Sequence, residues 1–73
     1  MLIKTFQITL LNKDALGFYS DAVKLCPTNP IAVIGLVKYK SFIITATQDT
    51  ILFLKLKYRI DTIIEMKTYN ERI

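Results

Sequence analysis

The sequence predicts an α+β domain in which an N-terminal strand and one helix precede an antiparallel β-meander of three or four strands. Three observations support this prediction. Residues 1–11 alternate between apolar and polar, residues 13–26 place apolar side chains three to four positions apart, and residues 31–67 are rich in β-branched side chains. A small OB or SH3-like barrel is one alternative architecture, and a helical C-terminal segment is another.

The chain has 73 residues, which suits a single domain spanning residues 1–73, close to the size at which one core is marginally stable. Hydrophobic residues make up 52% of the sequence. So short a chain cannot cover that much apolar surface by itself. We therefore expect a homo-oligomer or a subunit of a larger complex.

The first half of the chain contains a strand, a helix and a loop. Met1–Leu11 alternates as a half-buried strand does, and Lys13–Cys26 carries the apolar stripe of a helix, with Asn12 as its expected N-cap. Pro27 and Pro30 end the helix and form a loop.

The second half is dominated by β-favouring residues. Ile31–Val37 is a continuous apolar run, as in a strand covered on both faces, and Phe42–Thr47 is the next strand. A reversal at Tyr39–Lys40 would separate the two segments. Gln48–Asp49 is the expected turn of a β-hairpin leading into a third strand.

Residues 50–68 follow this turn and have apolar side chains at even positions and charged ones at odd positions, which favours a strand over the rival helix. As one straight strand, the eighteen residues Thr50–Lys67 would span roughly 60 Å, too long for a small domain. We therefore expect a bend or bulge near Lys57–Asp61, or a strand that reaches into a second subunit.

The basic residues are concentrated between Lys38 and Arg59, and this span accounts for the whole net charge of +4. The hairpin register would place Lys40 opposite Lys57, Lys38 opposite Arg59, and Tyr39 opposite Tyr58. Like charges in such positions are destabilising unless solvent or a bound polyanion offsets them. The predicted nucleic-acid-binding residues are Lys38, Lys40, Lys55, Lys57, Arg59, Tyr39 and Tyr58.

We expect this patch to hold the DNA or RNA backbone without sequence preference, with the tyrosines stacking on bases. One arginine among five basic residues argues against base-specific readout. An acidic protein surface is another partner that fits. The bland alternative is a solvated lysine face that limits aggregation, with the tyrosines in ordinary cross-strand packing.

Catalysis is not expected. The sequence has no histidine, so Ser20 and Ser41 lack the usual activating base, and no acid–base pair, phosphate-binding loop or metal-ligand spacing is recognisable. Cys26 is the only cysteine and is expected to be a buried structural thiol. The sequence therefore predicts a non-enzyme without cofactor or metal. The alternative function is a small protein–protein assembly subunit or inhibitor that uses its apolar surface or a strand edge.

We expect a soluble protein in the cytoplasm or an equivalent reducing intracellular compartment. The longest apolar run, Ile31–Val37, is far too short to span a membrane, and no secretory signal is recognisable.

Overall fold

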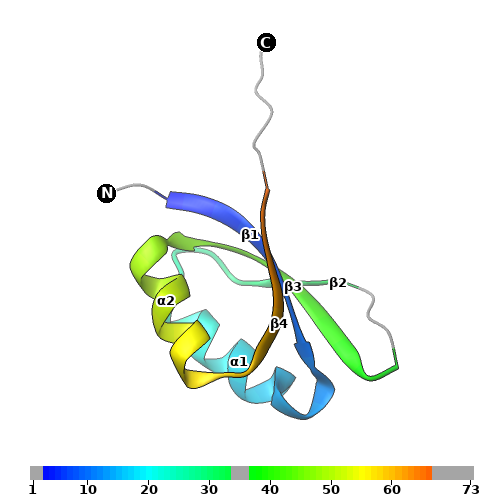
Figure 1. The fold of residues 1–73 in the computed structure, drawn as a ribbon. Coiled ribbons are helices and arrows are strands. Elements are labelled where there is room, and N and C mark those ends of the chain that lie inside the picture. The colour runs from blue at the N-terminus through cyan, green and yellow to red at the C-terminus, as the bar shows by residue number, and fades with distance from the viewer. Residues whose placement is uncertain (1–2, 34–36, 67–73) are drawn as a thin grey trace.

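The computed structural model describes residues 3–33 and 37–66. In chain order the elements are β1 (Ile3–Leu11), α1 (Asn12–Leu25), β2 (Ile31–Val33), β3 (Tyr39–Thr47), α2 (Gln48–Lys57) and β4 (Ile60–Met66) (Figure 1). The α+β class is confirmed, with the element order β-α-β-β-α-β. None of the helices among these residues is long and apolar enough to cross a membrane.

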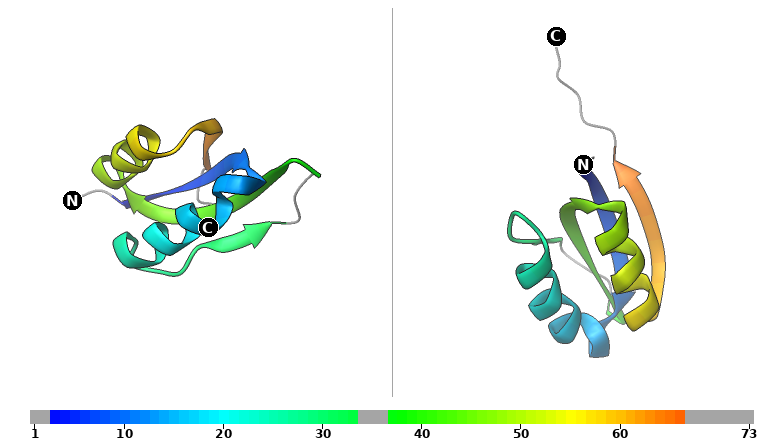
Figure 2. Two further views of the ribbon diagram at one scale, coloured as in Figure 1. Left: turned by 90° about the horizontal axis from the view of Figure 1, so that it is seen from below. Right: turned by 90° about the vertical axis from the view of Figure 1, so that its left-hand side faces the viewer.

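The four strands form one sheet in the order β2-β3-β1-β4, and all neighbouring strands are antiparallel. Strands β1 and β2 are parallel to each other because β3 lies between them and opposes both. This is the split β-α-β arrangement of ferredoxin-like topology. Both helices lie on the same side of the sheet (Figure 2).

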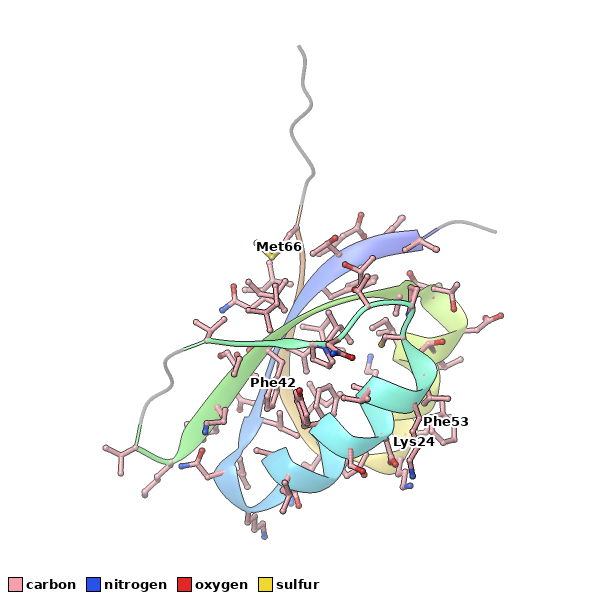
Figure 3. The ribbon with its side chains drawn as sticks, turned by 180° about the vertical axis from the view of Figure 1, so that it is seen from behind. Lys24, Phe42, Phe53 and Met66 are labelled. Carbon is pink, nitrogen blue, oxygen red and sulfur yellow. The ribbon has the colours of Figure 1, made fainter. Side chains whose placement is uncertain are left out.

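The core lies between the sheet and the two helices. The even-numbered residues of β1 and β3 face the helices, and Phe6, Ile8, Phe42 and Ile44 are all buried. From α1, the fully buried Phe18 stacks on Phe42 with ring centroids 5.6 Å apart. Phe42 therefore lies between α1 and the sheet, as its place beside α1 in Figure 3 shows.

The other side of the sheet carries neither helix. We call it the open face, and it consists of the odd-numbered residues of β1, β2 and β3 together with Thr62, Ile64 and Met66 of β4. Its residues are apolar or uncharged polar. Met66 lies well away from the helices in Figure 3.

The first half of the chain matches the sequence prediction closely. The strand is confirmed over Ile3–Leu11, and its first two expected residues, 1–2, lie outside the described residues. The helix and the loop at Pro27–Pro30 are confirmed within a residue at their ends, and Cys26 is buried. Asn12, however, is not the N-cap. Leu11 occupies that position without a side-chain cap, and the Asn12 side-chain amide instead donates to the Val37 carbonyl.

The predicted hairpin at Gln48–Asp49 is wrong, because residues 48–57 form α2 and the helical alternative is correct here. The β-branched residues that favoured a strand are concentrated in Ile60–Met66, which does form β4. Residues 51–57 consist mainly of leucine and lysine, which are good helix formers. Their alternation places apolar side chains all around the helix, so it mimics a strand pattern in the sequence.

The expected bend near Lys57–Asp61 is present, as the change from helix to strand at Tyr58–Arg59, and the β1–β4 register shifts between Thr9 and Leu10. Strand β2 is not covered on both faces: it is a three-residue edge strand, and Ile31 is 62% exposed. It pairs antiparallel with β3, so the chain reverses between the two strands. The reversal is not at Tyr39–Lys40 as expected, because these are the first two residues of β3 and pair with β1. The sheet has two edges, at β2 and β4, so it is not a barrel. The rest of the predicted strand over Ile31–Val37, residues 34–36, lies outside the described residues, as does the end of the 50–68 segment.

Thr47 is the last residue of β3 and the N-cap of α2, and its hydroxyl oxygen accepts a hydrogen bond from the Thr50 backbone N–H at 3.3 Å. We expect Thr47→Val to lower the free energy of unfolding by about 1 kcal/mol, because the valine keeps the branched shape but leaves this N–H without its cap. Thr47→Ser keeps the acceptor and should stay within about 0.5 kcal/mol of wild type. Urea unfolding followed by circular dichroism measures both, and equal losses in the two variants would contradict the cap.

Candidate functional site

The sheet brings several of the predicted site residues to one end of the domain. Tyr39 pairs with Leu11, the last residue of β1, and Ile60 pairs with Leu10 on the other side of the same strand. The starts of β3 and β4 are therefore separated by two strand spacings, roughly 10 Å. Lys38 and Arg59, which adjoin these residues in the sequence, lie at the same end.

Four exposed cationic residues gather here, and we call them the basic end: Lys38, Lys40, Lys55 and Arg59. Arg59 and Tyr39 line a shared depression of about 210 Å³, and Lys55 lines a neighbouring one of about 230 Å³. Asp61 borders both depressions and partly offsets their charge.

Lys38 and Lys40 are positioned by the start of α1. The Asn12 backbone N–H donates to the Lys38 carbonyl at 2.9 Å, which ties the chain before β3 to the first turn of the helix. Lys40 points to the helix side, where it lines a groove of about 450 Å³ between α1, β2 and β3. Tyr19 and Phe42 supply aromatic surface to this groove.

The ion pairs among the described residues leave the basic end out. Lys4 pairs with Glu65 at 3.4 Å, and Lys57 pairs with Asp21 at 2.7 Å. Neither pair involves Lys38, Lys40, Lys55 or Arg59. Within the described residues, the charges of the basic end are therefore exposed to solvent.

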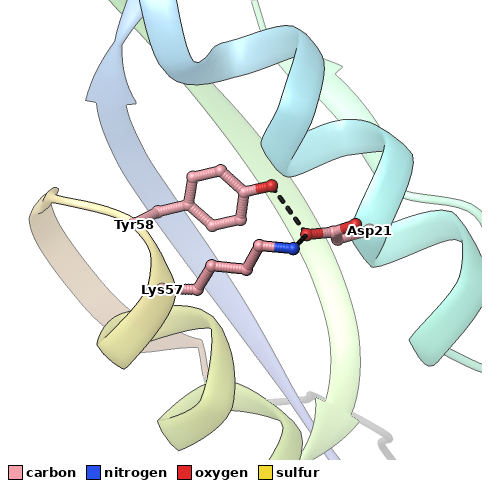
Figure 4. A network of polar contacts seen from close by, with 3 residues as sticks. All are labelled: Asp21, Lys57 and Tyr58. Atoms are coloured by element: carbon pink, nitrogen blue, oxygen red, sulfur yellow. Dashed lines mark hydrogen bonds and ion pairs between the residues drawn. The ribbon is translucent and has the colours of Figure 1, made fainter.

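Lys57 and Tyr58 are separated from the basic end by their contacts with α1. The Tyr58 hydroxyl donates to Asp21 Oδ2 at 2.6 Å, and the Lys57 ammonium lies on the same oxygen (Figure 4). The Tyr58 ring also meets Phe18 edge to face, at 5.8 Å between centroids. Tyr58 is directed inward in this arrangement rather than toward a base.

The Asp21 contacts shift the pKa of all three groups. Hydrogen bonds from Lys57 and Tyr58 lower the pKa of Asp21 from its ordinary value of 3.8. The hydrogen bond to Asp21 in turn raises the pKa of Lys57 and of Tyr58. All three shifts favour the charged carboxylate, the ammonium and the neutral phenol together.

Gly17 gives Tyr58 the space for this position. A Cβ at residue 17 would lie 3.2 Å from the Tyr58 hydroxyl oxygen, and Asp21 holds that oxygen in place. A larger residue at position 17 would therefore require the Tyr58 hydroxyl to shift by a few tenths of an ångström, so the glycine has a packing role in α1.

The sequence pattern missed Asp21, which organises this network. Asp21 and Tyr58 are 37 positions apart, and no local spacing connects them. Among the described residues, no group of three or more His, Cys, Asp or Glu side chains could hold a metal ion. The seven predicted binding residues thus divide into a solvent-facing set and the Lys57–Tyr58 pair that binds Asp21.

Comparison with family models finds no match, and comparison with curated proteins and with solved structures finds no significant similarity.

The shifted pKa of Asp21 predicts how stability depends on pH. A carboxylate whose pKa is lower in the folded state than in the unfolded state stabilises the fold. This stabilisation is fully present at pH values above the ordinary pKa of 3.8, and it is lost as the pH falls through the folded-state pKa. Asp21→Asn should therefore be less stable than wild type at neutral pH, and the difference should shrink as the pH falls below 3.8. Urea unfolding of both proteins across this range measures it.

Tyr58→Phe is the matched control for Asp21→Asn, because it removes one donor while keeping the ring contact with Phe18. It should cost less than Asp21→Asn at neutral pH. A wild-type advantage over Asp21→Asn that stays constant down to about pH 2.5 would show that the carboxylate charge does not stabilise the fold.

Proposed function

We propose that this domain is a non-enzymatic module that holds the phosphate backbone of DNA or RNA at its basic end. The observation that carries the proposal is the gathering of Lys38, Lys40, Lys55 and Arg59 at one end of the sheet, outside the ion pairs of the described residues. Mobile lysine side chains neutralise phosphates as point charges, without the fixed geometry that reads bases.

The arrangement favours backbone contact over base stacking. Tyr39 is the sole aromatic residue on the open face in the described part of the chain, and it lies at the edge of that face, where β3 begins. Proteins that read single strands on a sheet stack bases on several central aromatic side chains. Here Tyr39 lies beside Arg59, so one base at most could stack next to the neutralised phosphates.

A second candidate function is that of an assembly subunit binding another protein through its apolar surface or a strand edge. Its supporting observation is the open face, where Ile31 is 62% exposed and Ile64 is 57% exposed. Apolar contacts of this kind respond little to salt, whereas phosphate contacts weaken steeply. Salt dependence therefore separates the two functions.

Fluorescence anisotropy with labelled single-stranded and duplex oligonucleotides, across a range of salt concentrations, tests the first function. Four phosphate contacts predict a slope of log K against log salt of about −3 to −3.5, similar for unrelated base sequences. The double variant Lys38→Gln/Lys55→Gln should reduce the magnitude of that slope by about two.

The double variant Lys4→Gln/Lys24→Gln is the control, since it removes the same charge from elsewhere. Lys4 is near the start of β1 and Lys24 near the end of α1, both roughly 18–23 Å along their elements from the basic end. This variant should keep the wild-type slope. No binding at low salt, or equal effects of the two double variants, would sink the proposal.

A further inference from the structure

We propose that the open face binds the open face of a second copy of this chain, forming a two-fold symmetric dimer with the two sheets packed face to face. The inference builds on the second candidate function, since it names the partner and the surface. It does not depend on nucleic-acid binding at the basic end.

The first observation is the absence of charge. The chain has ten basic and six acidic residues, yet none of the described open-face residues that pair in the sheet is charged. Asp61, unpaired at the register shift of β4, and Arg59 border the face only at the basic end. An antiparallel sheet that faces water on one side normally alternates buried apolar residues with polar and charged ones. The outward positions here avoid lysine and glutamate on all four strands, as expected for a surface that becomes covered.

The second observation is an apolar row that crosses the sheet. Ile31, Ile43, Gln7 and Ile64 are paired neighbours on β2, β3, β1 and β4. Three of these four side chains are isoleucines, and the Gln7 amide lies between the second and the third. Met66 of β4 adds a further apolar side chain, 37% exposed, near this row.

The third observation concerns the hydroxyl groups beside this row, which already bind one another. The Thr9 and Ser41 hydroxyl oxygens are 2.7 Å apart, and those of Thr5 and Thr45 are 3.3 Å apart. Burying a hydroxyl is costly chiefly when it loses its partner. Because these pairs are made within one sheet, they survive when water is excluded from the face.

These features fit a second copy better than a charged partner. An acidic protein or a nucleic acid would find no cation on the described part of this face. Two copies that each carry a net charge of +4 can meet here without placing like charges in contact. Gln7 is self-complementary across a two-fold axis, since each amide can donate to and accept from the other.

The area is sufficient for a modest dimer. Strands of nine, nine, seven and three residues, at ~3.3 Å per residue and ~4.8 Å between strands, cover roughly 450 Å² of flat face. Projecting side chains increase the accessible area, so two copies would bury on the order of 1,000 Å², near the lower bound for a specific interface. We expect a dissociation constant in the micromolar range, about 1–100 μM.

Sedimentation velocity of the full chain over a series of concentrations tests the dimer. Wild type should shift from monomer to dimer as concentration rises, with little effect of salt. Ile64→Lys should abolish this shift, because it places two charges in the apolar contact. Leu56→Lys is the matched control: Leu56 is 80% exposed on α2, so the variant adds the same charge on the helix side and should dimerise like wild type.

Gln7 tests the symmetry of the contact. Gln7→Glu and Gln7→Lys should each be monomeric, since each opposes like charges across the two-fold axis, and an equimolar mixture of the two should form a heterodimer. Circular dichroism confirms that every variant is folded. A wild-type protein that remains monomeric at about 500 μM, five times the upper expected dissociation constant, overturns the proposal. Dimerisation that Leu56→Lys abolishes and Ile64→Lys leaves intact overturns it as well. Neither result bears on binding at the basic end, which the oligonucleotide titration measures separately.

Discussion

The contact of Phe18 with Phe42 and Tyr58 joins the three parts of this fold. Phe18 belongs to α1 and Phe42 to strand β3 of the sheet. Tyr58 is the residue that directly follows α2. With the Tyr58 ring held against Phe18, its hydroxyl reaches Asp21 and the adjacent Lys57 reaches the same carboxylate oxygen. The chain then leaves α2 toward the sheet, which places Arg59 beside the end of β1. The position of Arg59 in the basic end thus depends on an aromatic contact in the core.

Because both helices pack on one side of the sheet, the molecule has surfaces of two different characters. Cations gather at the sheet end where α1 begins, and the described open face is uncharged and partly apolar. The two surfaces suit different contacts, since phosphate binding needs mobile charge in solvent whereas a dry interface needs its absence. The two surfaces share few residues, with Tyr39 at their boundary, so the two proposed contacts do not compete for the same side chains.

A sequence pattern predicted an element correctly where local interactions determine that element's structure. Strand β1 alternates over Thr5–Leu10 because Phe6, Ile8 and Leu10 face one continuous helix layer, and that pattern is visible in the sequence. For residues 50–57 the same pattern led to a wrong strand prediction, because a short alternation of leucine and lysine fits either a strand or a helix that is apolar all round. The Thr47 cap and Asp49 in the first turn were the local signals that favoured the helix.

The sequence by itself determined the α+β class, the first strand and helix, the proline loop, and the concentration of basic charge between residues 38 and 59. Only the tertiary structure decided which of those charges face solvent. Lys57 and Tyr58 are neighbours of Lys55 and Arg59 in sequence, but Asp21, 36 positions before Lys57, binds both of them. The pairing of β1 with β3 and β4, rather than a hairpin register, brought Lys38 and Arg59 to one end. Such contacts depend on packing between distant segments, and the periodicity within a segment contains no information about them.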